Sequence, residues 1–292
     1  MPGSPPTQRV LDVLELLAGS SAARTASDIS NELGLSRSTA GAVLGVLEER
    51  DWVRRSPELT YQLGAGAMAF AASAQARGDL PGPGALAAIE ALAADLDCGA
   101  ALAIVARSHM VFVAVSTGRG RIPAVITPGA RLPYRAPTGA TIAAFNDEQS
   151  QQQWLRQAST RARMNEYRDV LEQIRTRGVA VWGVAAENAG FLDVLAEVAG
   201  HLDDHPATGA LRDRVLTMLS DLGGRPYSAA TVDSDFDLPI SYLTAPVLKA
   251  DGRAGWELQI GPLRPAVSRA EREHYSARLT ATARLLSHGN NN

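Results

Sequence analysis

Two short runs of the sequence carry hydroxyl and guanidinium groups at a spacing suited to holding DNA. A guanidinium can bind a phosphate or the edge of a guanine, and a serine or threonine hydroxyl can donate to backbone oxygens. A small methyl side chain can contact only the thymine methyl group. The candidates for DNA contact are Arg37, Ser38, Thr39 and Ala42 in the first run, and Arg54 and Arg55 in the second.

Three helices and a hairpin are predicted to position these groups. Apolar residues recur at helical spacing over 7–17. Thr25, followed three residues later by an aspartate, resembles a capping box, and the short helix that it opens should end at Gly34. Ser36 is a favoured N-cap for the next helix, and the alternating pattern over 52–64 predicts a β-hairpin. Together these elements predict a winged helix-turn-helix at 1–63.

A second domain is expected after the glycines and prolines of 78–84, which mark the strongest break in the sequence. We therefore assign 64–84 to a linking helix and hinge, and 85–292 to an effector-binding and oligomerisation domain. Its strands and helices do not alternate regularly, which predicts an α+β fold on an antiparallel sheet. Helices are expected at 85–96, 139–145, within 149–177, within 190–222 and at 268–286, and strands at 100–106, 110–116, 124–127, 179–184, 243–248 and 255–260.

The overall charge does not by itself indicate a nucleic-acid partner, because the net charge is -3 and the pI is about 6.0. Any DNA-binding surface must therefore be a local one. The single cysteine, Cys98, excludes an internal disulfide and a cysteine-rich zinc site. No stretch has the length and apolarity of a membrane span or the pattern of a signal peptide, so we expect a cytoplasmic protein without a membrane partner.

The whole chain resembles the IclR family of bacterial transcriptional regulators. The resemblance implies a GAF-like effector domain that senses a small organic molecule, often a carboxylate or an aromatic acid. It also implies a homodimer or tetramer that binds double-stranded operator DNA. The matching blocks are 8–17, 27–39 and 61–64 in the first domain, and 129–139, 177–180, 244–248 and 260–262 in the second.

Three departures from the family pattern affect the expected function. Gly41 and Ala42 stand where the family usually has a large or basic pair, so DNA shape should contribute more to recognition than base contacts. Leu258 and Ile260 stand where some members place small hydroxyls toward the ligand, which predicts an aromatic or apolar effector. The segment between Gly178 and Ala245 is also long for the family, and the helices predicted within 190–222 occupy it.

The effector contacts are expected around the block that contains Arg135, where a guanidinium offers a bidentate fork to a carboxylate. Arg131 and Tyr134 flank the same block. Surface ion pairs explain such arginines equally well, and single aromatic residues belong to a core more often than to a pocket. The effector-binding candidates are Arg135, Thr138, Gly139, Tyr242, Trp256, Leu258 and Ile260.

Other functions have weaker support in the sequence. His201 and His205 have a helical metal-ligand spacing, but the proline after His205 disfavours the helix that would place both on one face. The sequence has no nucleophile elbow, phosphate-binding loop or zinc-protease motif, so neither catalytic residues nor a cofactor are expected. The alternatives are a winged-helix scaffold for protein interaction or dimerisation and, less favoured, a small-molecule enzyme.

Overall fold

The structure is a computed structural model of the chain. It divides into two compact units, with the elements up to α4 in the N-terminal unit and those from α5 to α12 in the C-terminal unit. Each unit is described separately. The described residues are 5–20, 22–76, 83–118, 128–158, 160–183 and 225–289, with Ile126, Val198, Leu211, Arg214, Val215 and Met218 as single residues.

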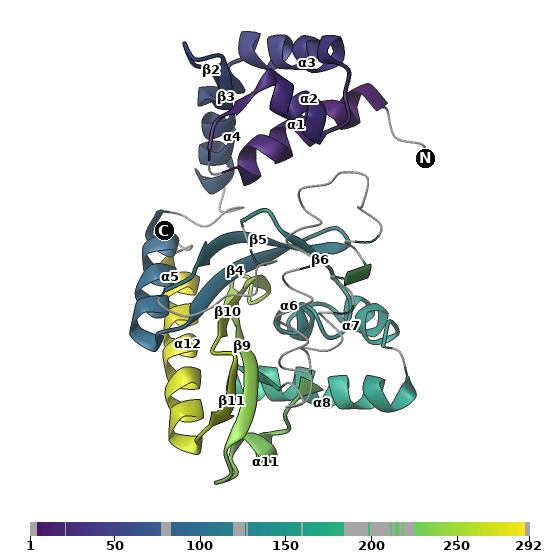
Figure 1. The fold of residues 1–292 in the computed structure, drawn as a ribbon. Coiled ribbons are helices and arrows are strands. Elements are labelled where there is room, and N and C mark those ends of the chain that lie inside the picture. The colour runs from purple at the N-terminus through teal and green to yellow at the C-terminus, as the bar shows by residue number, and fades with distance from the viewer. Residues whose placement is uncertain are drawn as a thin grey trace. The chain divides into compact units, whose positions relative to one another are not determined.

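The N-terminal unit is the predicted winged helix-turn-helix (Figure 1). Its three-stranded sheet has the order β1-β3-β2, and all neighbouring strands are antiparallel. The two-residue strand β1 was not predicted. The elements are α1 (Pro5–Gly19), β1 (Arg24–Thr25), α2 (Ala26–Glu32), α3 (Arg37–Glu49), β2 (Val53–Arg55), β3 (Thr60–Leu63) and α4 (Ala65–Ala76).

Local capping signals fix the two helices of the helix-turn-helix, as the sequence predicts. The Thr25 hydroxyl accepts the backbone N–H of Asp28, while the Asp28 carboxylate accepts the backbone N–H of Thr25 at 2.9 Å. Gly34 follows α2 with a φ of +60°, a left-handed conformation that glycine adopts without strain. The Ser36 side chain accepts the backbone N–H of Thr39 and so caps α3.

Apolar residues at helical spacing hold the three helices against the wing. Ile29 and Leu44 are fully buried, so the crossing of α2 and α3 is fixed by side-chain packing. This leaves the polar residues at the start of α3 on the outside. The core consists of Val13, Leu17, Ile29, Leu44, Leu47, Val53 and Tyr61.

The C-terminal unit is an α+β domain on an antiparallel sheet, as predicted. In the described residues the order is β6-β5-β4-β10-β9-β7-β8, and β11 pairs with β9. The elements are α5 (Pro83–Leu96), β4 (Gly99–Ala106), β5 (His109–Ser116), β6 (Arg131–Pro133), α6 (Ala140–Ala144), α7 (Glu148–Leu155), α8 (Arg161–Arg177), β7 (Ala180–Gly183), β8 (Arg225–Pro226), α11 (Ala229–Val232), β9 (Leu238–Leu248), β10 (Ala254–Gly261), β11 (Arg264–Val267) and α12 (Arg269–Gly289).

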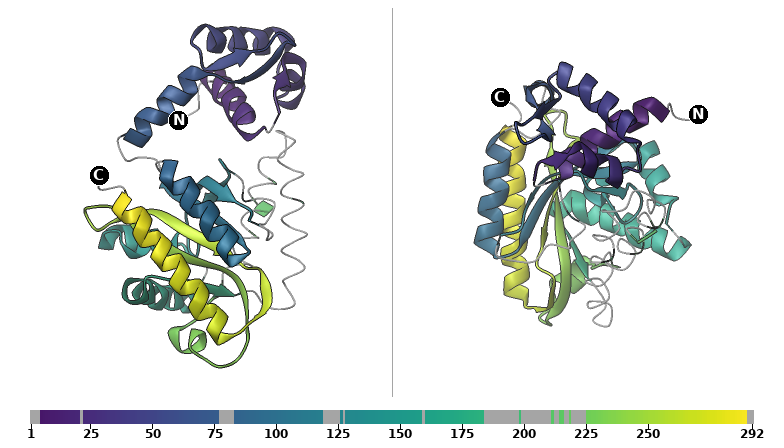
Figure 2. Two further views of the ribbon diagram at one scale, coloured as in Figure 1. Left: turned by 90° about the vertical axis from the view of Figure 1, so that its left-hand side faces the viewer. Right: turned by 45° about the horizontal axis from the view of Figure 1, so that its top comes forward.

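Helices cover both faces of this sheet. Figure 2 shows α5 and α12 side by side over one face, which we call the helix-pair face. The short helix α6 packs on β9 and β10 from the opposite face, and α8 packs on α6 (Figure 1). We call this second face the α6 face. Because both faces are covered, the central strands are buried on both sides and their sequences alternate only weakly.

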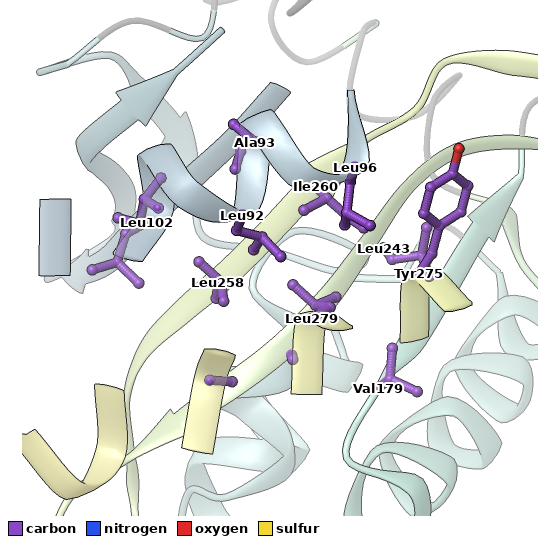
Figure 3. Close-up of a cluster of buried hydrophobic side chains, with 14 of the residues drawn as sticks. Leu92, Ala93, Leu96, Leu102, Val179, Leu243, Leu258, Ile260, Tyr275 and Leu279 are labelled. Atoms are coloured by element: carbon purple, nitrogen blue, oxygen red, sulfur yellow. The ribbon is translucent and has the colours of Figure 1, made fainter. Parts of the chain in front are cut away.

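The main core lies between the sheet and the helix pair. Figure 3 shows leucines of α5 packed against Leu258, Ile260 and Leu279. Each of these last three side chains has no exposed surface. A separate cluster on the α6 face contains Trp154, Tyr167 and Trp182. The sheet therefore separates two packed layers, and the parity of a residue along its strand decides which layer it joins.

The sequence prediction missed several short or irregular elements. The strands β6, β8 and β11 and the helix α11 were not predicted, and β9 begins five residues earlier than expected, at Leu238. Pro239 explains the late predicted start, because proline normally disfavours a central strand. The helices predicted within 190–222 and most of the strand predicted at 124–127 lie outside the described residues. None of the described helices is long and apolar enough to cross a membrane.

Candidate DNA interface and effector site

The start of α3 presents a cluster of hydroxyls and one guanidinium on the surface. Arg37 and Ser38 are exposed and Thr39 is partly exposed. The Ser36 hydroxyl lies 2.9 Å from that of Ser38 and 2.8 Å from that of Thr39. The helix dipole adds a partial positive charge at this end. The cluster is therefore an ordered, donor-rich surface that suits an anionic backbone.

Small side chains continue this surface along α3. Gly41, Ala42 and Gly45 follow Ser38 at helical spacing, and all four residues are exposed. A Cβ atom added at Gly41 or Gly45 would meet no atom within 4 Å. The α3 backbone is thus uncovered beyond its first turn, which agrees with the expectation that large base-reading side chains are missing there.

The wing supplies the second pair of predicted DNA contacts. Arg54 and Arg55 lie on β2 and are both exposed. The Arg55 guanidinium carbon lies 5.7 Å from the centre of the Tyr61 ring on β3, within cation–π range. Arg54 lies opposite Gln62 in the register. Both arginines therefore lie at the surface of the wing, and the Arg55 side chain is also held against Tyr61.

The structure divides the predicted effector residues between the two faces of the C-terminal sheet. Trp256, Leu258 and Ile260 alternate along β10 and belong to the core on the helix-pair face. Figure 3 shows Leu258 and Ile260 in this core. Tyr242 on β9 packs with the cluster on the α6 face. The expectation that Leu258 and Ile260 meet the effector therefore needs correction. Their side chains are fully buried against α5 and α12, so they give no support for an apolar pocket.

The remaining predicted residues lie in the loop that leads into α6. Arg135 is half-buried, and Thr138 is 8% exposed. The Thr138 carbonyl accepts a hydrogen bond from the Trp154 indole at 2.9 Å. Gly139 has a φ of +75°, and a Cβ atom there would lie 2.6 Å from the Tyr134 ring. Only glycine meets both conditions, so the loop is fixed tightly between Tyr134 and α6.

A buried carboxyl group on β10 was missed by the sequence prediction. Glu257 is 2% exposed and faces α6. Its Oε2 atom accepts hydrogen bonds from both the hydroxyl and the backbone N–H of Thr141, the latter at 3.2 Å. Burial raises the pKa of this carboxyl to about 7, against the lowering effect of the two Thr141 hydrogen bonds. Glu257 therefore titrates near neutral pH.

Aromatic residues belong to the same face of the sheet as this carboxyl. The rings of Trp182 and Tyr242 are stacked, with centroids 5.5 Å apart and an interplanar angle of 15°. The Trp182 indole donates to the Thr244 hydroxyl at 3.0 Å. Burial raises the pKa of Tyr134 to about 12 and that of Tyr242 well above its usual value, and the charge of Glu257 adds to both shifts. Both phenols are therefore within electrostatic range of Glu257 and stay protonated.

Two side chains near the centre of the sheet retain solvent access. Gln259 lies on β10 between β4 and β9, yet it is partly exposed on the α6 face. Tyr242 is also partly exposed, whereas Thr244 between them is 1% exposed. The period of two along β10 groups Glu257 with Gln259 and separates both from Leu258. This alternation is visible in the sequence, but it does not show which of the two sets of β10 residues faces α6.

The other predicted chemistry is less well defined. In the described part of the chain, no group of three histidine, cysteine, aspartate or glutamate side chains is placed to hold a metal ion. His201 and His205 lie outside that part. The three groups with raised pKa values on the α6 face are all shifted chiefly by burial. They do not form a pair whose pKa values are pushed in opposite directions, the pattern that typically marks a paired acid and base.

Comparison with known proteins identifies the N-terminal unit. Residues 6–57 match the family model of the IclR helix-turn-helix domain. No curated protein has significant sequence similarity to the chain. Solved structures nonetheless match over nearly its full length. An IclR transcriptional regulator from Alicyclobacillus acidocaldarius is 21% identical, with a TM-score of 0.58, and the match covers 98% of this chain and 99% of that one.

Two further solved structures have the same fold. HmgR from Pseudomonas aeruginosa is 22% identical, with a TM-score of 0.57 and coverage of 98% and 99% of the two chains. An IclR homologue from Microbacterium hydrocarbonoxydans, in complex with 4-hydroxybenzoate, is 17% identical, with a TM-score of 0.56 and coverage of 96% and 99%. Residues 6–57 therefore form an IclR helix-turn-helix domain, and over nearly its whole length the chain has the fold of the solved IclR transcriptional regulators.

Proposed function

We propose that this protein is a ligand-responsive transcriptional regulator that binds operator DNA through α3 and the wing. The observation that carries the proposal is the donor-rich start of α3 within an IclR helix-turn-helix domain. In this motif the second helix enters the major groove with its N-terminal residues toward the bases. Arg37, Ser38 and Thr39 occupy those positions, and Arg54 and Arg55 would contact flanking phosphates.

DNA binding is tested by removing these guanidinium groups. Each lost phosphate contact lowers the salt dependence of binding, by about 0.9 in the slope of log K against log salt concentration. Arg37→Ala, and Arg54→Ala with Arg55→Ala, should therefore weaken binding and flatten its salt dependence. The matched control is Arg50→Ala, because the exposed Arg50 caps the C-terminal end of α3, about 20 Å from its start.

The measurement is fluorescence anisotropy on DNA from the intergenic region beside the gene, at several salt concentrations. Normal affinity and slope in both arginine variants would refute the interface. An equal loss in Arg50→Ala would show that binding depends only on overall charge.

We place the effector site on the α6 face, around the loop that holds Arg135, Thr138 and Gly139. The partly exposed Tyr242 and Gln259 support this location, because they leave side-chain surface accessible at the middle of an otherwise buried sheet. The relative bound to 4-hydroxybenzoate supports a small organic ligand. We also propose that effector binding changes the affinity for operator DNA, and that the regulated genes encode catabolic or transport proteins.

The effector site is tested with paired substitutions on the two faces of the sheet. Gln259→Leu on the α6 face should abolish the thermal stabilisation given by an active compound, with little change in the stability of the free protein. Leu258→Ser on the helix-pair face should lower stability by about 2–5 kcal/mol, because it opens a cavity in the core. The ligand-induced shift should nevertheless survive in the folded fraction. The reverse pattern would place the ligand on the helix-pair face.

The active form should be a homodimer or tetramer, because one helix-turn-helix reads only one half-site and two must lie about 34 Å apart. The helix α4 is the candidate contact. Its Met68 and Phe70 are 72% and 64% exposed, although Phe70 also packs against Trp52 with ring centroids 5.6 Å apart. Sedimentation should show dimers or larger species, and Met68→Glu should shift them toward monomers. Only monomers, with and without DNA, would contradict the assignment.

A further inference from the structure

Glu257 is a buried acid that the DNA-binding function does not use. The pairs of β10 with β4 and β9 place it opposite Ala103 and Pro246, inside the sheet. Burying a carboxyl group without a charged partner is costly, so its presence here calls for a physical reason. Thr141 satisfies only Oε2. Within the described residues, no group donates a hydrogen bond to the second oxygen, Oε1.

Among the described residues, the phenols of Tyr134 and Tyr242 lie within electrostatic range of Glu257, and no positively charged side chain shifts its pKa. The described strands contribute uncharged side chains to the rest of the α6 face, among them the stacked pair Trp182 and Tyr242. Aromatic faces attract cations, and they do so more strongly when the site is shielded from water. The elements packed around Glu257 also carry Arg135 in the loop before α6, Tyr167 on α8, whose hydroxyl accepts from Arg163, and Arg175 on α8, which donates to the Ala144 carbonyl of α6 at 2.9 Å.

These features favour one class of effector over the others. A ligand carboxylate would bring a second negative charge beside Glu257, so that one of the two would have to be protonated. A protonated amine would instead supply the opposite charge and a donor to Oε1, forming a charge-assisted hydrogen bond. We propose that the effector is a small amine, held by an ion pair with Glu257 and by the Trp182–Tyr242 rings. This inference rests on the proposed effector site on the α6 face.

The test uses three probes that share one ring and differ only in the group at the end of a short chain. They are tyramine, which carries an amine, tyrosol, which carries a hydroxyl, and 4-hydroxyphenylacetate, which carries a carboxylate. Binding is measured by titration calorimetry on the full-length protein. Tyramine should bind most tightly, and its affinity should rise between about pH 6 and about pH 8 as Glu257 ionises.

The substitution Glu257→Gln keeps the shape of the side chain and removes its charge. It should weaken tyramine binding by about 10- to 100-fold, the loss expected for one charge-assisted hydrogen bond. It should not weaken binding of the acid, and it should remove the pH dependence for tyramine. The matched control is Glu90→Gln, because Glu90 is exposed on α5. Thermal unfolding of each variant checks that it is folded, and Tyr242→Ala gives a second test through loss of the ring.

Several outcomes would overturn the proposal. They are preferential binding of the acid, tyramine affinity unchanged in both Glu257→Gln and Tyr242→Ala, or no tyramine binding at millimolar concentration. Calorimetry involves no DNA, so the result is independent of operator binding. Amine binding by a protein that does not bind DNA would refute the regulator function and leave this inference intact. Operator binding without amine binding would refute this inference alone.

Discussion

Neutralising Glu257 should make the C-terminal unit more stable at neutral and alkaline pH, which is unusual for the loss of a polar group in a core. The substitution Glu257→Gln keeps an oxygen that can accept the two Thr141 hydrogen bonds. It also removes a charge that burial disfavours. The size of the effect follows from the pKa of the carboxyl in the folded and unfolded chains.

The pKa of Glu257 is about 7 in the folded protein and 4.5 for an ordinary glutamate. Below pH 4.5 the carboxyl is protonated in both states, so it creates no pH dependence. As the pH rises toward 7, the unfolded chain releases this proton first, and the folded state loses relative stability. The two pKa values differ by about 2.5, and each unit corresponds to about 1.4 kcal/mol. Between the acid and alkaline ends of this range, the wild-type protein should therefore lose about 3.5 kcal/mol of folding stability that the variant keeps.

Differential scanning calorimetry between about pH 4 and about pH 8.5 measures this loss. The unfolding temperatures of the two proteins should agree at the acid end. At the alkaline end the variant should unfold several degrees higher, at about 2–4 °C per kcal/mol for a unit of this size. The other titrating groups contribute equally to the pH dependence of both proteins, so their contributions cancel in the difference between the two unfolding temperatures. Three of the four tryptophans, Trp154, Trp182 and Trp256, lie in the C-terminal unit, so fluorescence of a Trp52→Phe background can assign the transition to this unit.

The control is a glutamate with the opposite pKa shift. Hydrogen bonds from Ser268 and Arg264 lower the pKa of Glu271 to about 2, so Glu271 stabilises the folded state above its ordinary pKa and loses this effect only as the pH falls below 4.5. Glu271→Gln should lower stability by a nearly constant amount from pH 5 upward. A flat difference curve for Glu257→Gln over the same range would refute the assignment of a buried, neutral-pH carboxyl.

Three further predictions concern other parts of the chain. Arg272 is 1% exposed and donates to four backbone carbonyls, including those of Val232 and Val267. Arg272→Met should therefore cost roughly 3 kcal/mol or more in chemical denaturation, and a loss below about 1 kcal/mol would contradict this network. Gly45→Ala should raise the stability of the N-terminal unit by about 1 kcal/mol, because alanine has the higher helix propensity and the added methyl group meets no neighbour. Calorimetry measures this change, and a lower unfolding temperature would show that the site is crowded. Cys98 is buried, and burial raises the pKa of its thiol to about 11. Iodoacetamide at neutral pH should therefore modify Cys98 only after unfolding, as measured by mass spectrometry. Rapid labelling of the native protein would show that the thiol is accessible.

The N-terminal unit could be predicted almost completely because its signals are local. The caps at Thr25 and Ser36, the glycine at Gly34 and the helical spacing of buried residues each act within a few residues of one another. The exposure of Arg37 and Ser38 followed from the same spacing. Strand β1 was not predicted because two residues are too few to show the alternation of a strand. Only their pairing with β3 defines them as a strand.

In the C-terminal unit the sequence predicted the longer strands and helices, but not the role of each face of the sheet. Alternation along β10 groups Trp256, Leu258 and Ile260 together and sets them apart from Glu257 and Gln259. It cannot decide which group meets the helix pair, because helices cover both faces. For this reason the sequence could not show that Leu258 and Ile260 face the helix pair, whereas Glu257 and Gln259 face the proposed effector site.

The sequence by itself thus determined the winged helix-turn-helix, the fold class and the position of most elements, since hydrophobic period and capping are properties of neighbouring residues. The tertiary structure alone decided the environment of Glu257. Its burial depends on the pairing of β10 with β4 and β9 and on Thr141, which lies 116 residues away along the chain. Desolvation and hydrogen bonding from distant segments set the pKa of a carboxyl, so no local pattern could have revealed it.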